Sequence, residues 1–268
     1  MTSMAGSDKE LLVVSFGTSF GDSRERTIGA IEKALAAAFP EYMVCRAFTS
    51  QMIINKLKER DGIEIDNVPG ALERAAGAGV KELVIVPTHL MDGFEYHKLL
   101  GYIEEHKANF RRVSTGRPLL SSDDDLTETA KAIAQAAGGY LDGETAFCYM
   151  GHGTGAASNA VYEKLAGRLR LLGYRDIYIG TVEAAPTLYD LLAQVQAGRY
   201  RRVALRPLMI VAGDHASNDM AGDDPDSWKS TFAAAGYNVE CILSGLGELP
   251  AVQQLFIAHA RDAMQPTL

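Results

Sequence analysis

The sequence predicts an α/β protein of two similar lobes, each a parallel sheet flanked by helices, that face each other across a cleft. Two observations lead to this prediction. Short apolar runs alternate with segments of helical apolar spacing, a pattern typical of parallel sheets with helices on both faces. This pattern then restarts midway along the 268 residues, and the length allows two lobes of ordinary domain size.

The first half contains four predicted strands and four predicted helices. Leu11 to Phe16 is an apolar run that ends at Gly17, as expected for a strand buried on both faces. Arg24 to Phe39 has helical apolar spacing and stops at Pro40. The remaining predicted strands are 43–48, 83–87 and 110–115, and the remaining helices are about 51–60, 69–78 and 94–107.

The second half repeats this arrangement. Its predicted elements are a helix at about 124–137, strands near 145–150, 176–180, 201–206 and 238–242 with helical stretches between them, and a final helix at about 249–263. The segment from Pro118 to Asp125 is rich in proline, serine and aspartate, which favours a boundary there. We therefore expect an N-terminal lobe of residues 1–122 and a C-terminal lobe of residues 123–268. The final helix is a candidate to pack back on the first lobe.

Short matching segments indicate that the two halves are related by duplication. The matches pair Phe16-Gly17-Thr18 with His152-Gly153-Thr154, and pair Val86-Pro87, Gly93 and Glu95 with Arg206-Pro207, Gly213 and His215. The second set has a constant offset of 120 residues. It predicts that Glu95 faces the cleft opposite His215, although so short a match leaves coincidence as the alternative.

Composition excludes several classes of function. The net charge of −8 disfavours nonspecific binding of nucleic acid. No apolar run approaches the roughly 18 to 20 residues that span a bilayer, and Met1 to Glu10 has no signal-peptide pattern. The three cysteines are scattered and form no CxxC pair. We expect a cytoplasmic protein with neither a membrane nor a nucleic acid as partner.

Nucleotide binding is also disfavoured. The glycines at 151, 153 and 155 lack the spacing of the GxGxxG fingerprint, and the chain has no P-loop.

Two histidines and a glutamate follow three predicted strands of the second half. His152 follows strand 145–150, Glu183 follows strand 176–180, and His215 follows strand 201–206. Adjacent strands lie about 4.8 Å apart, so side chains at their carboxyl ends can converge on one ion. Two imidazoles and a carboxylate suit a borderline divalent metal and leave coordination positions open. Structural histidines and a glutamate that caps a helix are the alternative.

The other histidines and acids are weaker candidates. His89 follows strand 83–87 and is expected to line the cleft, whereas His97 is expected at the surface or at a subunit contact. His106 and His259 are expected on exposed helix faces. The acidic run after His215 is expected to be a solvated loop and helix-cap region; it contains Asp219, Asp223, Asp224 and Asp226.

Longer segments resemble those of a known family. These segments are LLVVSFGTSF, GFEYHK, MGHGT, GTVEAAP and PLMIVAGDHASNDMAGDDPDSWK. They are similar to segments of the anaerobic cobalt chelatases of cobalamin biosynthesis, and the resemblance runs from Leu11 to His259. It implies a class II chelatase that inserts Co²⁺ into sirohydrochlorin without ATP or another nucleotide.

The resemblance also implies roles for individual residues. It makes His152, Glu183 and His215 the ligands of Co²⁺, which is the substrate metal, and Glu95 the glutamate that faces the cleft. Some relatives bind haem through a histidine near the segment GFEYHK, so haem binding at His97 stays open.

Metal insertion releases pyrrole protons, and we expect His152 and Glu95 to act in this step. The substrate carries several carboxylates, and arginines bind such groups bidentately. Arg24, Arg26, Arg46 and Arg206 lie near predicted strand ends. From these we select Arg46 and Arg206, with His89, as substrate-binding residues. Solvated ion pairs at the surface are the alternative for each arginine.

Two further functions compete with the cobaltochelatase. The ligand set cannot separate Co²⁺ from Fe²⁺, so a sirohydrochlorin ferrochelatase that works toward sirohaem is one alternative. A carrier that binds metal or tetrapyrrole without turnover is the other. The sequence leaves a homo-oligomer open.

Overall fold

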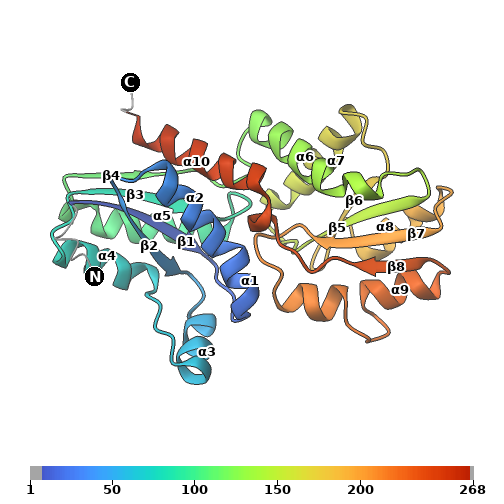
Figure 1. Ribbon diagram of the computed structural model, residues 1–268, viewed down its shortest axis with the longest axis horizontal. Helices are drawn as coiled ribbons and strands as arrows, with labels where there is room; N and C mark the ends of the chain where they lie inside the picture. The colour runs from blue at the N-terminus through green and yellow to red at the C-terminus, as the bar shows by residue number, and fades with distance from the viewer. Residues whose placement is uncertain (1–7, 266–268) are drawn as a thin grey trace. The chain divides into compact units, whose positions relative to one another are not determined.

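The computed structural model describes residues 8–265, which form two compact units. The first unit comprises residues 8–121 and 253–265, and the second comprises residues 122–252. Each unit contains a four-stranded parallel sheet with helices on both faces, which confirms the predicted fold class (Figure 1). Among the described helices, none has the length and apolar character needed to cross a membrane.

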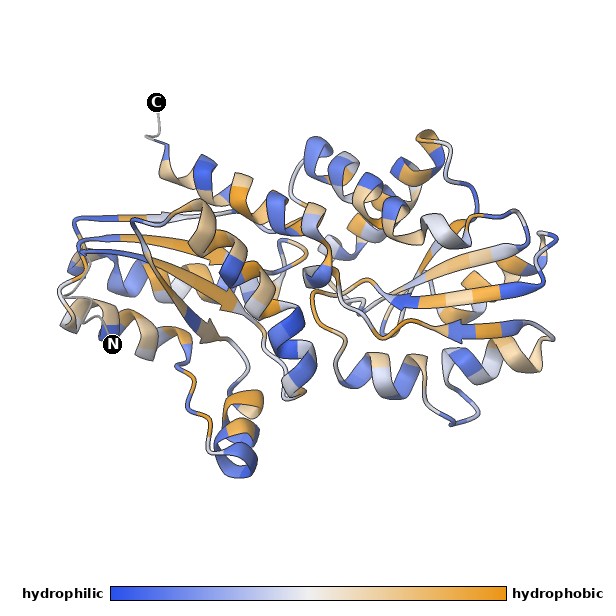
Figure 2. Ribbon diagram, viewed as in Figure 1, coloured by the Kyte–Doolittle hydropathy of each residue, from blue (hydrophilic) through white to orange (hydrophobic). Residues whose placement is uncertain are grey.

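The sheet of the first unit has the order β2-β1-β3-β4. Its strands are β1 (Lys9–Ser15), β2 (Met43–Phe48), β3 (Glu82–Pro87) and β4 (Arg112–Thr115). The two central strands, β1 and β3, are buried along almost their whole length, as expected of strands covered on both faces. Figure 2 shows the corresponding hydrophobic band along these strands.

Helices cover both faces of this sheet. They are α1 (Gly21–Arg26), α2 (Ile28–Ala38), α3 (Gln51–Asp61), α4 (Val68–Gly77), α5 (Phe94–His106), the short 3₁₀ helix η1 (Lys107–Asn109) and most of α10 (Pro250–Met264). On one face, Leu72 of α4 and Leu99 of α5 pack with Leu12 and Ile85 of the central strands.

Two sequence predictions for this unit are wrong in detail. The segment 24–39 forms two helices rather than one, because the helix is interrupted at Thr27. Thr27 has a distorted backbone between the two helices (φ −110°, ψ −79°), and its hydroxyl donates to the carbonyl of Ser23. His259 is buried rather than exposed, and its Nδ1 lies 3.1 Å from the carbonyl oxygen of Arg117.

The sheet of the second unit has the equivalent order β6-β5-β7-β8. Its strands are β5 (Thr145–Gly151), β6 (Ile177–Thr181), β7 (Arg202–Pro207) and β8 (Asn238–Cys241). Its helical segments are α6 (Asp123–Ala137), η2 (Gly138–Tyr140), η3 (Ala157–Asn159), α7 (Ala160–Leu171), α8 (Leu188–Gln196), the π-helix η4 (Ala216–Met220), α9 (Trp228–Ala234) and η5 (Leu246–Glu248).

Local sequence explains where these helices begin. The Ser122 side chain caps α6. The first turn of this helix carries three aspartates, whose negative charges interact favourably with the positive end of the helix dipole. Thr187 and Asp190 form a reciprocal capping box at the start of α8. On one face of the sheet, Leu191 of α8 and Phe232 of α9 pack with Leu205 of β7.

The two units share more than strand order. Beyond the end of the first strand of each unit, the parallel hydrogen-bonding pattern continues by one step. The Ser50 amide donates to the Phe16 carbonyl in the first unit, and the Glu183 amide donates to the His152 carbonyl in the second. His152 and Glu183 therefore occupy the register positions that Phe16 and Ser50 hold in the first unit, at the carboxyl edge of the sheet.

Candidate metal centre

Three loops at the carboxyl edge of the second sheet bring together His152, Glu183 and His215. One ligand atom from each of these side chains lies within 4.8 Å of the other two. The imidazole rings of His152 and His215 are nearly perpendicular, with centroids 4.7 Å apart. The Nδ1 atom of His152 lies 3.6 Å from Oε2 of Glu183. The structure thus brings together the three residues that the sequence predicts as metal ligands.

The close approach of two of these loops depends on Gly153. Its φ of +86° is a conformation that side chains with a Cβ rarely adopt. A Cβ at this position would lie 2.7 Å from Oγ1 of Thr181 and 2.9 Å from the backbone nitrogen of Ala184. Because glycine is present, the loop that carries His152 packs directly against the loop that carries Glu183.

Hydrogen bonds at Nδ1 orient both imidazole rings. The Nδ1 atom of His152 lies 2.9 Å from the carbonyl oxygen of Gly153, which can only accept a hydrogen bond. The Nδ1 atom of His215 lies 2.6 Å from Oδ2 of Asp219. These partners favour the neutral tautomer in which Nδ1 carries the proton. The lone pair of Nε2 on each ring is then available to a metal ion.

Asp219 is a functional candidate that the sequence analysis missed. It was expected to be one of several solvated acids, and this expectation holds for Asp223, which is exposed and binds Lys229 at 2.6 Å. Asp219 instead contacts His215 from within the π-helix η4. The spacing of four residues is the signal that could have found it, because residues four apart on a helical segment lie on the same side.

The three side chains are accessible to an incoming ion. His152, Glu183 and His215 keep 47%, 54% and 34% of their side-chain surface exposed. Metal bonds of about 2.1 Å place neighbouring ligand atoms about 3 to 4 Å apart, so a small contraction of this group suffices to hold an ion. Imidazole and carboxylate together suit Co²⁺, Fe²⁺, Ni²⁺ and Zn²⁺.

Two other predicted site residues, His89 and Glu95, lie at the carboxyl edge of the first sheet. His89 follows β3, and Glu95 is in the first turn of α5. Both ring nitrogens of His89 and Oε2 of Glu95 are shielded from solvent and have no hydrogen-bond partner. Desolvation lowers the pKa of His89 to about 4, and the negative charge of Glu95 partly opposes this shift.

The predicted substrate-binding arginines already have partners within their own units. Arg46 donates to both carboxylate oxygens of Glu32, at 2.7 and 2.6 Å. Arg206 is buried and donates to the carbonyl and hydroxyl oxygens of Ser244. His97 is exposed, with Nε2 located 2.7 Å from Oδ1 of Asp92.

The fold is similar to the folds of two solved proteins. SirB from Bacillus subtilis, solved with Fe³⁺, has a TM-score of 0.66 at 12% identity, with 95% of each chain covered. CbiX, described as the terminal enzyme of sirohaem biosynthesis in denitrifying bacteria, has a TM-score of 0.57 at 18% identity, over 96% of this chain and all of the other.

Sequence comparison defines the family. The model of the cobalt chelatase (CbiK) family matches residues 9–265, and the chain belongs to this family. A sirohydrochlorin cobaltochelatase of Salmonella typhimurium is 41% identical over 96% of both chains. The sirohydrochlorin cobaltochelatase CbiKC of Nitratidesulfovibrio vulgaris is 30% identical over 96% of this chain and 90% of its own.

The contact between Asp219 and His215 predicts a role in metal affinity. Replacing Asp219→Asn weakens the acceptor that orients His215, and we expect the affinity for Co²⁺ to fall about 10- to 100-fold with little loss of stability. Calorimetric titration with Co²⁺ measures the effect. Asp223→Asn is the matched control and should bind Co²⁺ like the unchanged protein. Equal affinities for both variants would remove Asp219 from the site.

The low pKa of His89 predicts a loss of stability in mild acid. Its folded-state value of about 4 lies below the ordinary value of 6.5. As the pH falls from 6.5 to 4, the unfolded chain binds a proton that the folded chain rejects, which lowers the free energy of unfolding by up to about 3 kcal/mol. Urea unfolding of His89→Leu should show a weaker pH dependence than the parent, whereas His106→Gln should not. Parallel pH curves for His89→Leu and the parent would refute this assignment.

Proposed function

We propose that this protein is a sirohydrochlorin cobaltochelatase, which inserts Co²⁺ into sirohydrochlorin without ATP in anaerobic cobalamin biosynthesis. The observation that carries the proposal is the convergence of His152, Glu183 and His215 on one accessible point. The proposal is supported by membership of the cobalt chelatase family and by two relatives that bear this name.

In the proposed mechanism, the three side chains hold Co²⁺ and present it to the macrocycle. Three protein ligands leave coordination positions open, so pyrrole nitrogens can enter while the protein still holds the ion. The exposure of all three side chains allows the ion to arrive from solvent and to depart with the product. Because the ligands are neutral imidazoles and one carboxylate, they bind Co²⁺ without the permanence of a thiolate site.

Insertion also requires the macrocycle to lose its two pyrrole protons as the ion enters. We assign Glu95 as the group that accepts a proton, with His152 as a second acceptor once the metal leaves it. Glu95 suits this role because one of its oxygens is shielded and has no hydrogen-bond partner. The neighbouring His89 is neutral near pH 7, since its pKa is about 4, and it can bind substrate without adding a competing charge.

Arg46 and Arg206 remain part of the proposed substrate-binding set, together with His89. The internal partners of the two arginines hold their guanidinium groups in fixed positions. A substrate carboxylate would have to share Arg46 with Glu32, or share Arg206 with Ser244. We therefore expect each to contribute less to affinity than an arginine without such a partner would.

The proposal is tested by the rate at which Co²⁺ enters sirohydrochlorin, followed by absorption. His152→Ala and His215→Ala each remove a ligand and should lower kcat/KM at least about 100-fold. Glu95→Gln should lower turnover about 100-fold and leave Co²⁺ affinity unchanged, because it removes a proton acceptor and not a ligand. His106→Gln, at the opposite end of α5 from Glu95, is the control.

Three outcomes would contradict this proposal. Unchanged rates in both histidine variants would remove the metal centre from catalysis. Faster insertion of Fe²⁺ than of Co²⁺ would favour a ferrochelatase. Stoichiometric retention of Co²⁺ or sirohydrochlorin without turnover would favour a carrier.

A further inference from the structure

The carboxyl edge of the first sheet contains a buried arginine whose hydrogen bonds are incomplete. Arg24 lies in α1, and only 7% of its surface is exposed. Its Nε and Nη1 atoms are shielded from solvent and have no hydrogen-bond partner. A guanidinium is always charged, and leaving its donors buried and unpaired is costly. This arrangement indicates that an anion accepts the missing hydrogen bonds of Arg24.

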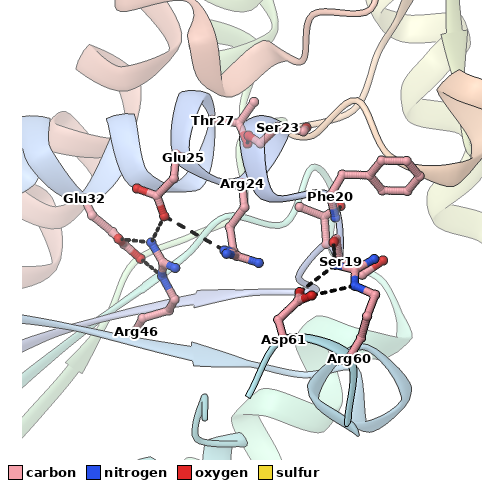
Figure 3. Close-up of polar contacts among 11 residues, drawn as sticks. Ser19, Phe20, Ser23, Arg24, Glu25, Thr27, Glu32, Arg46, Arg60 and Asp61 are labelled. Atoms are coloured by element: carbon pink, nitrogen blue, oxygen red, sulfur yellow. Dashed lines mark hydrogen bonds and ion pairs between the residues drawn. The ribbon is translucent and has the colours of Figure 1, made fainter. Parts of the chain in front are cut away.

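The carboxylates around Arg24 do not supply these bonds. Oε1 of Glu25 lies 3.9 Å from Nε of Arg24, beyond hydrogen-bond reach, and the Glu25 side chain is more than half exposed. Figure 3 shows Arg24 between two ion pairs, one formed by Arg46 with Glu32 and the other by Arg60 with Asp61.

In both neighbouring ion pairs, the arginine and the carboxylate are hydrogen-bonded to each other. Arg46 holds Glu32 through two hydrogen bonds. Arg60 holds Asp61 through two more and also donates to the carbonyl of Ser19. The hydrogen bond from Arg60 is the main cause that lowers the pKa of Asp61, and the charge of Arg24 contributes to the same shift. Both carboxylates are therefore committed elsewhere. Arg24 forms only a long ion pair of 3.9 Å with the exposed Glu25, so its Nε and Nη1 donors keep their hydrogen bonds for an external anion.

Exposed apolar side chains lie in segments that follow the strands at this same edge of the sheet. Phe16 and Phe20 belong to the loop between β1 and α1, and they expose 51% and 38% of their surface. Met52, near the start of α3, and Phe94, at the start of α5, are 70% and 78% exposed. Large apolar side chains exposed at one edge of a sheet indicate a ligand with an apolar surface. Combined with guanidinium donors that lack hydrogen bonds, they fit a flat ring that carries carboxylates at its periphery.

We propose that Arg24 binds one peripheral carboxylate of the tetrapyrrole through its Nε and Nη1 donors. The inference rests on the proposed function, because it takes the substrate to be a carboxylated macrocycle. Arg24 is then a binding residue that sets affinity and orientation and takes no part in metal coordination. Since such a contact is made equally in the ground state and the transition state, its loss should raise KM and spare kcat.

The test compares Arg24→Gln and Arg24→Lys with Arg60→Gln, each titrated with metal-free sirohydrochlorin and separately with Co²⁺. Arg24→Gln should weaken binding of the macrocycle about 10- to 100-fold. Arg24→Lys keeps the charge but loses the bidentate geometry, so its affinity for the macrocycle should lie between those of the parent and Arg24→Gln. Arg60→Gln removes the same charge from an arginine that is already hydrogen-bonded to a carboxylate. We expect its affinity for sirohydrochlorin to change less than about 3-fold. Co²⁺ affinity should be unchanged in all three.

The results separate this inference from the proposed function. If the parent inserts Co²⁺ and Arg24→Gln binds sirohydrochlorin as tightly as the parent does, the inference fails and the function stands. Equal losses in Arg24→Gln and Arg60→Gln would also overturn it, because they would show a general effect of charge. If Arg24→Gln does not fold, Arg24→Lys decides, and parent-like binding by that variant refutes the bidentate contact. If the parent binds no sirohydrochlorin, the proposed function itself fails.

Discussion

The proposed metal centre depends on the hydrogen-bond register between β5 and β6 where these two strands end. The Glu183 amide donates to the His152 carbonyl at 2.9 Å, which fixes two of the proposed ligands side by side. Gly153 permits this approach, because a side chain at its position would collide with Thr181 and Ala184. The third proposed ligand, His215, follows β7 on the other side of β5 and is oriented by Asp219. A site assembled on strand ends is held by the sheet and not by flexible loops alone.

The two units share a strand order but carry different chemistry at the equivalent edge. Where the second unit has His152 and Glu183, the first has Phe16 and Ser50, so among the described residues the proposed ligand set lies in the second unit. The first unit instead presents exposed apolar side chains and shielded polar atoms without partners, on His89, Glu95 and Arg24. This division suits a reaction with two substrates of different character, a cation and a carboxylated macrocycle.

Much of the fold could be predicted because buried parallel strands appear in the sequence as short apolar runs. The apolar run at Leu11 to Phe16 predicted β1 nearly to its ends, and the strand-end positions predicted that His152, Glu183 and His215 come together. Interactions between side chains were harder to predict. The break at Thr27 depends on a hydroxyl that bonds to the backbone, and the role of Asp219 depends on a helical turn after His215. Nothing in the sequence shows that Arg46 is hydrogen-bonded to a carboxylate while Nε and Nη1 of Arg24 have no hydrogen-bond partner, because this follows from the packing of α1 and α2 on the sheet.

The coordination of cobalt tests the central claim most directly. X-ray absorption at the cobalt edge, with one equivalent of Co²⁺, reports the number of imidazole ligands on the ion. The account predicts two imidazoles with oxygen ligands in the parent, and one imidazole in His215→Ala. A spectrum without imidazole, or one that His215→Ala leaves unchanged, would contradict it.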